Sequence, residues 1–167
     1  MWFPKFIKTF VEKIRKRKPV AVQPVTPEEE WQALFKHCRI INPEFNPQNY
    51  PLESSGNTTP VKPVGFNDWL SGHDVLKRFA HDGLTPAKLR AAKRFLRQNA
   101  IQPNHPVAVA GAQWVNPRYG HICIPVFQNI RGETVVCLHF IDGNYIPLTI
   151  WLVEDHSPAA KPLPVKS

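Results

Sequence analysis

The apolar positions of this chain recur with two different periods, and the change between them lies near residue 103. Before Pro103 most apolar side chains recur at spacings of three and four, the period of one helix face. After Pro106 apolar and polar residues alternate, and β-branched and aromatic types are frequent, as in half-buried strands. The pattern therefore predicts helices followed by a sheet, which is an α+β fold.

Residues 1–19 carry the pattern of a short amphipathic helix. Pro4 suits a first turn, where a missing N–H is tolerated, and Pro19 ends the pattern. One side is basic and continues into the run Arg15–Lys18. The other side is an apolar stripe made of Phe3, Phe6, Ile7, Phe10, Val11 and Ile14. We expect a basic amphipathic helix in front of the remaining chain.

Residues 20–64 have the composition of a proline-rich linker with one short helix inside it. Thr26 suits an N-cap, Pro27 suits the first helical position, and three glutamates match the positive end of the helix dipole. Apolar residues then follow at helical spacing in WQALFKHC. The pattern predicts a helix over 27–38 that docks on the main domain through Trp31, Leu34 and Phe35.

Residues 65–156 form the expected core domain, and they begin with a helix pair. An apolar stripe runs from Phe66 to Ala80, Gly83 suits a left-handed cap, and a second helix is predicted from Thr85 to Asn99. The short turn between them has the length found in helix-turn-helix units. We therefore expect a helical hairpin.

Four strand-like segments follow, divided by the turn sequences NPRYG, NIRG and DGN. They predict a small antiparallel β-meander on which the helical hairpin packs. Pro125 and Pro147 lie inside these segments and should face an unpaired edge or a bulge, because proline cannot donate to a strand ladder. The composition of residues 157–167 predicts a disordered tail.

The charge of the chain is strongly positive and unevenly distributed. Basic residues exceed acidic ones by eight among 167 residues. Residues 1–20 contribute +6 and residues 66–105 contribute +4, whereas residues 106–156 contribute −2. A surplus of this sign favours polyanionic partners, either nucleic acid or an anionic membrane surface.

The three cysteines, Cys38, Cys123 and Cys137, do not make a disulfide scaffold. A reducing compartment fits them best, and we expect the protein in the cytoplasm, with the inner membrane surface as an alternative position. Charged residues interrupt the N-terminal apolar pattern, and no run of about 18 apolar residues occurs, so neither a signal peptide nor a membrane-spanning helix is expected.

The second helix of the expected hairpin is the candidate nucleic-acid site. Three arginines at spacings of four and three should form one stripe, with lysines beside them and no acid in the helix. Phosphate contacts or a groove-facing helix would suit that stripe, although a solvated basic face covering the sheet is the alternative. The residues concerned are Lys88, Arg90, Lys93, Arg94 and Arg97.

The N-terminal helix is the candidate for docking on a membrane surface or on a protein partner. Aromatic residues on one side and a block of cations beside them are what an interfacial helix needs, and the same features suit a partner groove or an arm along nucleic acid. The residues concerned are Trp2, Phe3, Phe6, Phe10, Lys13, Arg15, Lys16, Arg17 and Lys18.

A near-palindrome of thiols and imidazoles surrounds the NIRG turn. If residues of a hairpin pair so that their numbers sum to 260, His121 faces His139, Cys123 faces Cys137, and all four lie on one face. Zinc accepts such a ligand set. A type I turn in NIRG would instead give sums of 261 or 262, and a slip of one places the two pairs on opposite faces.

The sequence contains no phosphate-binding glycine loop, no G-x-S-x-G and no H-E-x-x-H motif, so we do not expect an enzyme. It predicts a non-catalytic nucleic-acid-binding accessory or regulatory protein. The first alternative is an interaction or inhibitor protein that acts through the N-terminal helix and the sheet. The second alternative is a small zinc-binding protein. No other cofactor is expected, and the oligomeric state is left open.

Overall fold

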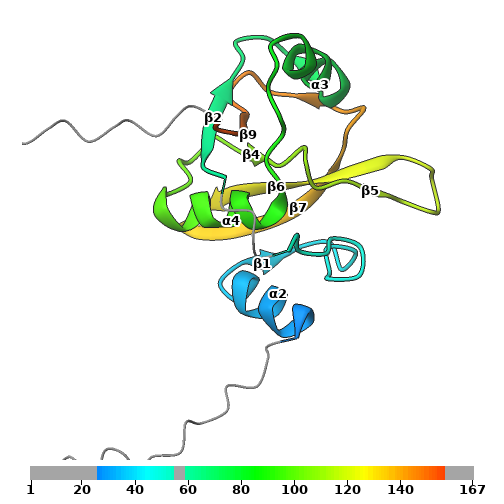
Figure 1. Ribbon diagram of the computed structural model, residues 1–167, viewed down its shortest axis with the longest axis vertical. Coiled ribbons are helices and arrows are strands. Elements are labelled where there is room, and N and C mark those ends of the chain that lie inside the picture. The colour runs from blue at the N-terminus through cyan, green and yellow to red at the C-terminus, as the bar shows by residue number, and fades with distance from the viewer. Residues whose placement is uncertain (1–25, 55–58, 157–167) are drawn as a thin grey trace, which may run out of the picture.

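A computed structural model describes residues 26–54 and 59–156 of the chain (Figure 1). Within these ranges a mixed seven-stranded sheet has the order β1-β7-β6-β4-β9-β2, and β5 pairs with β6 beside this path. A second sheet contains only β3 and β8. The strands are β1 (Arg39–Ile40), β2 (Val61–Gly65), β3 (Leu70–Ser71), β4 (Val107–Ala108), β5 (Trp114–Val115), β6 (Ile122–Ile130), β7 (Glu133–Phe140), β8 (Asn144–Tyr145) and β9 (Ile150–Glu154).

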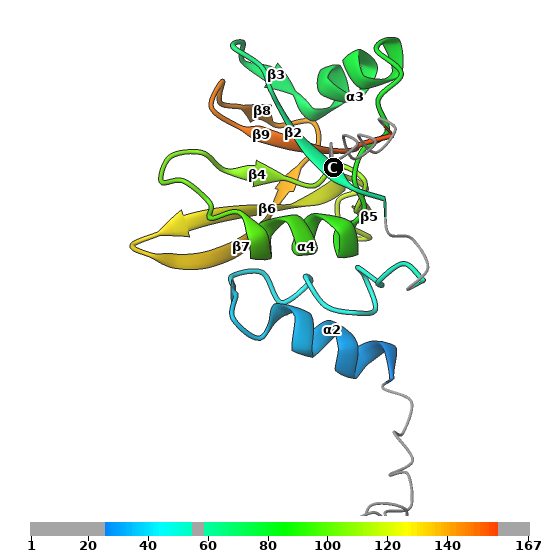
Figure 2. The same cartoon turned by 60° about the vertical axis from the view of Figure 1, so that its left-hand side comes forward.

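Side chains alternate between the two faces of the main sheet, and each face carries its own apolar cluster. Val107 and Leu152 belong to one cluster, whereas their neighbours Ala108 and Trp151 belong to the other. Helices α2 (Pro27–Phe35) and α4 (Leu89–Gln98) cover the first face, and α3 (Gly72–His81) covers the second. Figure 2 shows this layering, with α3 on one side of the sheet and α4 followed by α2 on the other. The predicted α+β class is therefore confirmed.

The predicted helical hairpin is not present, because α3 and α4 pack on opposite faces of the sheet. The segment that joins them runs along β9: Glu154 donates its backbone N–H to Thr85 at 2.8 Å, and Ala87 donates to Leu152 at 2.8 Å. Gly111 lets the chain pass closely here, since a Cβ at that position would lie 2.4 Å from the carbonyl oxygen of Ala87. The two helices are therefore held apart by paired backbone.

The stretch from residue 66 to 71 is not helical, although its apolar residues fit the helical stripe. Leu70 belongs to β3, and α3 begins only after Ser71, whose Oγ accepts a hydrogen bond from the N–H of Asp74 at 3.2 Å. Trp69 is 66 % exposed, so it does not contribute to a buried stripe. A serine cap thus sets the helix start at Gly72, six residues after the beginning of the apolar stripe.

Helix α2 begins as predicted. Thr26 and Glu29 form a reciprocal capping box, in which the Thr26 hydroxyl accepts from the Glu29 N–H and the Glu29 carboxylate accepts from the Thr26 N–H. Pro27 occupies the first turn, and the helix ends at Phe35 rather than at residue 38. Its apolar face docks through Trp31 and Phe35, which are 5 % and 2 % exposed.

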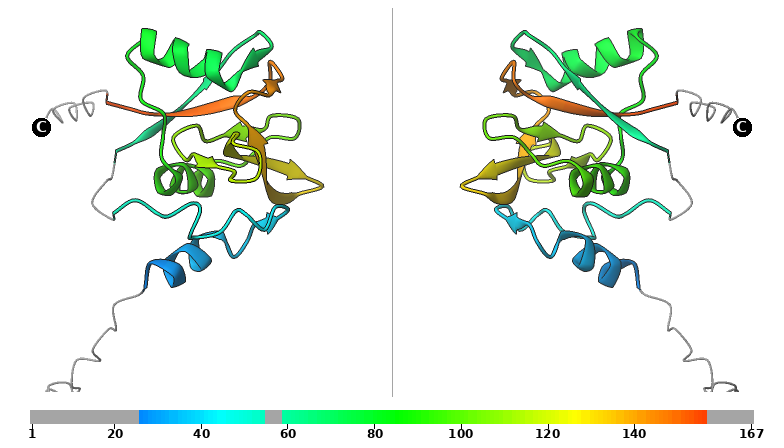
Figure 3. Two further views of the ribbon diagram at one scale, coloured as in Figure 1. Left: turned by 90° about the vertical axis from the view of Figure 1, so that its right-hand side faces the viewer. Right: turned by 90° about the vertical axis from the view of Figure 1, so that its left-hand side faces the viewer.

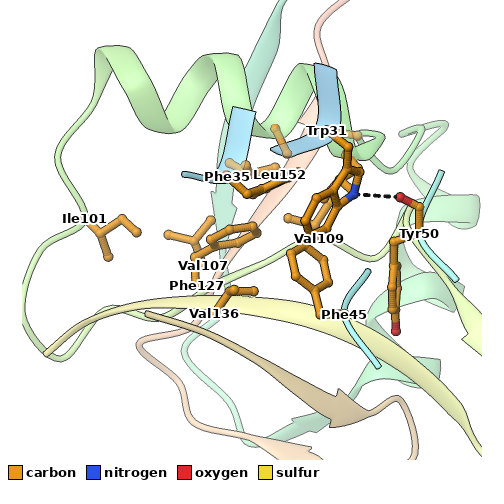
Figure 4. Packing of buried hydrophobic residues seen from close by; sticks show 13 residues of the cluster. Trp31, Phe35, Phe45, Tyr50, Ile101, Val107, Val109, Phe127, Val136 and Leu152 are labelled. Atoms are coloured by element: carbon orange, nitrogen blue, oxygen red, sulfur yellow. Dashed lines mark hydrogen bonds between the residues drawn. The ribbon is translucent and has the colours of Figure 1, made fainter. Parts of the chain in front are cut away.

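The described part of the predicted linker is integral to the core. Phe45 and Tyr50 are almost fully buried, and the Trp31 indole N–H donates to the Tyr50 carbonyl at 3.0 Å. Figure 4 shows these aromatic rings packed over Phe127 and the aliphatic residues of the sheet. Prolines in this segment therefore shape an extended arm that wraps the domain, and they do not mark a spacer. Figure 3 shows the arm lying against the same side of the domain as α4.

The predicted antiparallel meander is also wrong in its connectivity. Strands occur in all four predicted segments, and β6 and β7 form the predicted hairpin. However, β9 pairs in parallel with β4 and antiparallel with β2, and β1 pairs in parallel with β7. The sheet is therefore mixed, and its last strand lies between two earlier ones.

The β6–β7 hairpin has a two-residue turn. Ile130 pairs with Glu133, and every cross-strand pair sums to 263. Arg131 and Gly132 both have positive φ, 54° and 85°, which is the conformation of a type I′ turn. The right-handed twist of two paired strands favours this turn over the type I turn considered from the sequence.

Both prolines that the sequence placed inside strands can be located. Val109, the residue after β4, donates its N–H to the Pro125 carbonyl. Pro125 therefore faces the segment that joins β4 to β5. Pro147 lies in the loop between β8 and β9. A third proline, Pro63, is in the outermost strand β2 opposite Leu152. In an antiparallel pair, hydrogen-bonded and non-hydrogen-bonded positions alternate along each strand. The Asp155 N–H donates to the Pro60 carbonyl, so position 60 is hydrogen-bonded and position 63, three residues later, is not. The nitrogen of Pro63 therefore points outward, away from β9.

Residues 1–25 and 157–167 lie outside the described residues. The predictions of an N-terminal amphipathic helix and of a disordered tail fall on these ranges.

Candidate functional site

The start of α4 is stabilised by a carboxylate from residues 26–54, the N-terminal arm that packs on this side of the sheet. Lys88, at the N-cap, makes no side-chain cap bond, and Glu53 replaces it. The Glu53 carboxylate accepts hydrogen bonds from the backbone N–H groups of Leu89 at 2.6 Å and of Arg90 at 3.0 Å. The first N–H groups of a helix have no partner within the helix, and the helix N-terminus attracts negative charge. The arm therefore supplies the hydrogen-bond acceptor and the negative charge that the first turn of α4 lacks.

The Arg90 side chain is bound by two residues of the same arm, Glu30 and Glu53. Its guanidinium pairs with the Glu30 carboxylate through both terminal nitrogens, and its Nε donates to the Glu53 carbonyl at 2.9 Å. The Arg90 side chain is only 15 % exposed. The bond from Arg90 lowers the pKa of the Glu30 carboxyl, and the same bond raises the pKa of Arg90. Arg90 is therefore a structural cation.

Lys93 points into the domain. The residue is 6 % exposed, its ammonium lies over the rings of Phe35 and Phe127 at 5.5 and 5.9 Å, and Nζ lies 2.9 Å from the sulfur of Cys38. A sequence pattern cannot show this, because lysine in a basic helix is normally assigned to solvent. Two of the five cations of the predicted nucleic-acid site, Arg90 and Lys93, are thus directed toward the interior.

The remaining three cations of α4, Lys88, Arg94 and Arg97, are exposed. Arg94 and Gln98 border a shallow cavity of about 270 Å³ that also includes the chain just before β2. These three side chains are the part of the predicted nucleic-acid site that remains available to a partner. They lie on the helix without the continuous Arg90–Arg94–Arg97 stripe that the spacing indicated.

The described residues are electrically balanced. They contain twelve Lys or Arg and twelve Asp or Glu residues, so the whole surplus of eight positive charges lies in residues 1–25 and 157–167. Residues 5–18 alone contribute six of the eight. Within the described ranges, the surplus on α4 is offset by acids elsewhere in the fold.

The four predicted metal ligands do not converge. At the observed register Cys123 faces Phe140 and Cys137 faces Val126, so the two thiols lie on opposite faces of the hairpin. His139 faces Ile124, and His121 lies 3.3 Å from a carboxylate oxygen of Asp142. Among the residues of known position, no group of three or more His, Cys, Asp or Glu side chains is arranged to hold a metal ion.

The nine residues predicted to dock on a membrane or partner all precede residue 26, so they lie outside the described residues. Within residues 26–54 and 59–156, every helix is too short or too polar to cross a bilayer.

Two features of the surface, a cavity and a carboxylate between two histidines, are not indicated by any sequence motif. A cavity of about 520 Å³ lies between the 102–106 loop, the β6–β7 turn and the exposed residues Ile146 and Leu148, and none of its lining residues is acidic. On another side, Asp142 bridges two half-exposed histidines, at 2.7 Å from His73 and 3.3 Å from His121. Only the tertiary structure brings these segments together, so sequence spacing gave no signal for them.

Comparisons with known protein families, with curated proteins and with solved structures found no match. The geometry around α4 and the distribution of charge are therefore the basis for a functional proposal.

Proposed function

We propose that this protein is a non-catalytic interaction protein that binds an anionic membrane surface through residues 2–18 and holds the domain formed by residues 26–54 and 59–156 at that surface. The observation that carries the proposal is the separation of charge. The described residues have no net charge, and residues 5–18 carry a surplus of six. The interior positions of Arg90 and Lys93 support it, because they remove two cations from the competing site on α4.

The composition of residues 2–18 matches a membrane surface better than it matches a nucleic acid. Trp2, Phe3, Phe6 and Phe10 supply an apolar aromatic side that phosphate contacts do not need but that the acyl boundary of a bilayer accepts. Each basic residue close to an anionic surface contributes about 1 kcal/mol of binding free energy. The same segment therefore supplies both terms of interfacial binding.

Vesicle flotation of the full chain tests this proposal. We expect binding to vesicles of phosphatidylcholine with phosphatidylglycerol, weaker binding to phosphatidylcholine alone, and loss of binding at high salt. Replacing Lys16 and Arg17 by Gln removes about 2 kcal/mol, so partition should fall roughly thirtyfold. Replacing Phe6 and Phe10 by Asp should abolish flotation.

The matched control changes two cations in the folded part. Arg94→Gln with Arg97→Gln removes the same charge as the Lys16/Arg17 variant, and it should leave flotation unchanged. Equal loss in both variants, or full flotation of the Phe6/Phe10 variant, would contradict a membrane role for the N-terminal segment.

A second candidate function is nucleic-acid binding through Lys88, Arg94 and Arg97, and the exposure of these three side chains is what favours it. DNA and RNA retention of the full chain and of the Arg94/Arg97 double variant separates the two proposals. Phosphate-directed binding predicts that the variant binds more weakly and that its affinity depends less steeply on salt. Unchanged retention would remove α4 as the contact surface.

A further inference from the structure

We propose that Cys38 and Lys93 form an oxidation site, in which hydrogen peroxide oxidises Cys38 and the amine of Lys93 then captures the oxidised sulfur as an N–S bond. The Nζ of Lys93 and the sulfur of Cys38 are 2.9 Å apart. This pair is independent of the membrane proposal, since both residues belong to the folded part.

The surroundings of Lys93 are what make the pair unusual. The residue is 94 % buried, and the aromatic rings of Phe35 and Phe127 flank its ammonium. Within residues 26–54 and 59–156, the Nζ of Lys93 has one hydrogen-bond partner, the sulfur of Cys38. A buried ammonium is costly unless a partner balances it. The sulfur of Cys38 is the polar atom placed to interact with it, at 2.9 Å.

Cys38 also has the environment of a reactive thiol. It is partly exposed, so a small oxidant can reach the sulfur, and it lies between the exposed residues Lys36, His37 and Arg39. Of these residues, Arg39 is paired with Glu133 at 3.0 Å. Reactive cysteines occur in partly exposed, electropositive surroundings of this kind, because the thiolate is the nucleophile.

The other two cysteines lack these features and serve as internal controls. Cys123 and Cys137 have backbone carbonyl oxygens as their recorded sulfur contacts, those of His121 and Val126. Burial raises the pKa of both thiols. They should remain protonated and unreactive under conditions in which Cys38 reacts.

The chemistry balances in two steps. In the first, the Cys38 thiolate attacks one peroxide oxygen, an S–O bond forms, and the O–O bond breaks. The departing hydroxide takes a proton from the Lys93 ammonium, which leaves a sulfenic acid, a neutral amine and water. Sulfur is oxidised by two electrons, and the two peroxide oxygens are reduced by one electron each. In the second step the amine attacks sulfur, the N–S bond forms, and the S–O bond breaks to release a second water.

The bond would join the segment after α2 to the middle of α4. Cys38 and Lys93 are 55 positions apart in the chain, and they meet only through the packing of the arm on the domain. A covalent link there fixes the arm to α4 by closing a long loop, as a disulfide would. Thiol reductants should reverse it, because cleaving the N–S bond to a thiol and an amine takes two electrons, as cleaving a disulfide does.

The test exposes the full folded chain to hydrogen peroxide, with and without dimedone, and maps the tryptic peptides by mass spectrometry. With dimedone, Cys38 should be labelled at least about tenfold faster than Cys137 and Cys123. Without it, a peptide pair linking Cys38 to Lys93 should appear and disappear on treatment with dithiothreitol. Equal labelling of the three cysteines would overturn the proposal, and dimedone labelling without the linked pair would overturn its second step.

Two variants separate activation from capture. Lys93→Met keeps the length of the side chain and removes its charge, and it should slow the labelling of Cys38 about tenfold or more. Lys93→Arg keeps a cation, so Cys38 should still be labelled, but no linked pair should form. Lys88→Met is the matched control on the surface of α4 and should change neither readout. Circular dichroism establishes that each variant is folded, and the relative rates of the three cysteines in the unaltered chain test the proposal if Lys93→Met does not fold.

Discussion

Glu53 and Leu89 are joined by a 2.6 Å hydrogen bond in which the side chain of one caps the helix of the other across 36 residues. The bond ties the end of the N-terminal arm to the start of α4. It explains why a helix whose own N-cap residue is Lys88 begins at Leu89. The arm and α4 therefore depend on each other for their stability.

The first prediction concerns this cap. Glu53→Ala leaves the N–H groups of Leu89 and Arg90 without an acceptor, so the free energy of unfolding should fall by about 1–2 kcal/mol. Urea denaturation followed by circular dichroism measures it. Glu44→Ala removes an exposed carboxylate from the same arm and is the matched control, with an expected change within about 0.5 kcal/mol. Equal effects would show that Glu53 has no capping role.

The second prediction compares two arginines of one helix. Arg90→Ala removes hydrogen bonds to Glu30 and to the Glu53 carbonyl from a nearly buried site, so unfolding should become easier by about 1–3 kcal/mol. Arg94→Ala, one turn later, should lie within about 0.5 kcal/mol of the unaltered protein. Thermal and urea unfolding of the two variants checks the difference. A larger effect at Arg94 would contradict the placement of these side chains.

The third prediction is a loss of stability in acid. Hydrogen bonds lower the pKa of the carboxyls of Glu30, Glu29 and Asp74, through Arg90, Thr26 and Ser71 respectively. The folded state then binds these protons less readily than the unfolded state, so their stabilisation is complete above the ordinary carboxyl pKa and is lost as pH falls. The urea midpoint should therefore drop from about pH 5 downward. In Glu30→Gln the drop should be smaller, whereas Glu44→Gln should follow the unaltered protein.

The fourth prediction concerns the β6–β7 turn. Gly132 has φ of 85°, a conformation that a Cβ disfavours, so Gly132→Ala should destabilise the fold by about 1 kcal/mol or more. Gly65→Ala is the control, because a Cβ there meets nothing within 4 Å and φ is not positive. Arg131→Asn should stabilise the hairpin by a few tenths of a kcal/mol, since asparagine tolerates this position better. Urea midpoints of the three variants give the order, and a neutral Gly132→Ala would argue against the type I′ turn.

The parts of the fold that were predictable are those that local chemistry determines. Thr26, Pro27 and Glu29 specify the start of α2 by capping alone, and the four strand segments near the C-terminus follow from alternation and residue type. The register of the β6–β7 hairpin was not predictable, because Arg131 is an unusual residue for positive φ. The sequence therefore favours a longer turn, which shifts the predicted cross-strand pairs along the hairpin from the observed ones.

The arrangement of the strands depends on contacts that sequence spacing does not reveal. Nothing local to Val61–Gly65 indicates that this proline-containing segment pairs with Ile150–Glu154. In the same way, the basic pattern of α4 suggested a partner outside the molecule for Arg90 and Lys93. Their partners are Glu30, Glu53 and Cys38, which lie far earlier in the chain. The burial of a cation is decided by which distant segment covers it.

The position of β9 in the sheet has a consequence for biosynthesis. Strand β9 lies between β4 and β2 and supplies pairing to both, yet among the strands of the described residues it is the last to leave the ribosome. Until Glu154 has been made, β2 has no neighbour and the apolar cluster that contains Trp151 and Val153 is incomplete. The sheet therefore closes only after translation of nearly the whole domain, and the nascent chain exposes unpaired strand edges and apolar surface for that time.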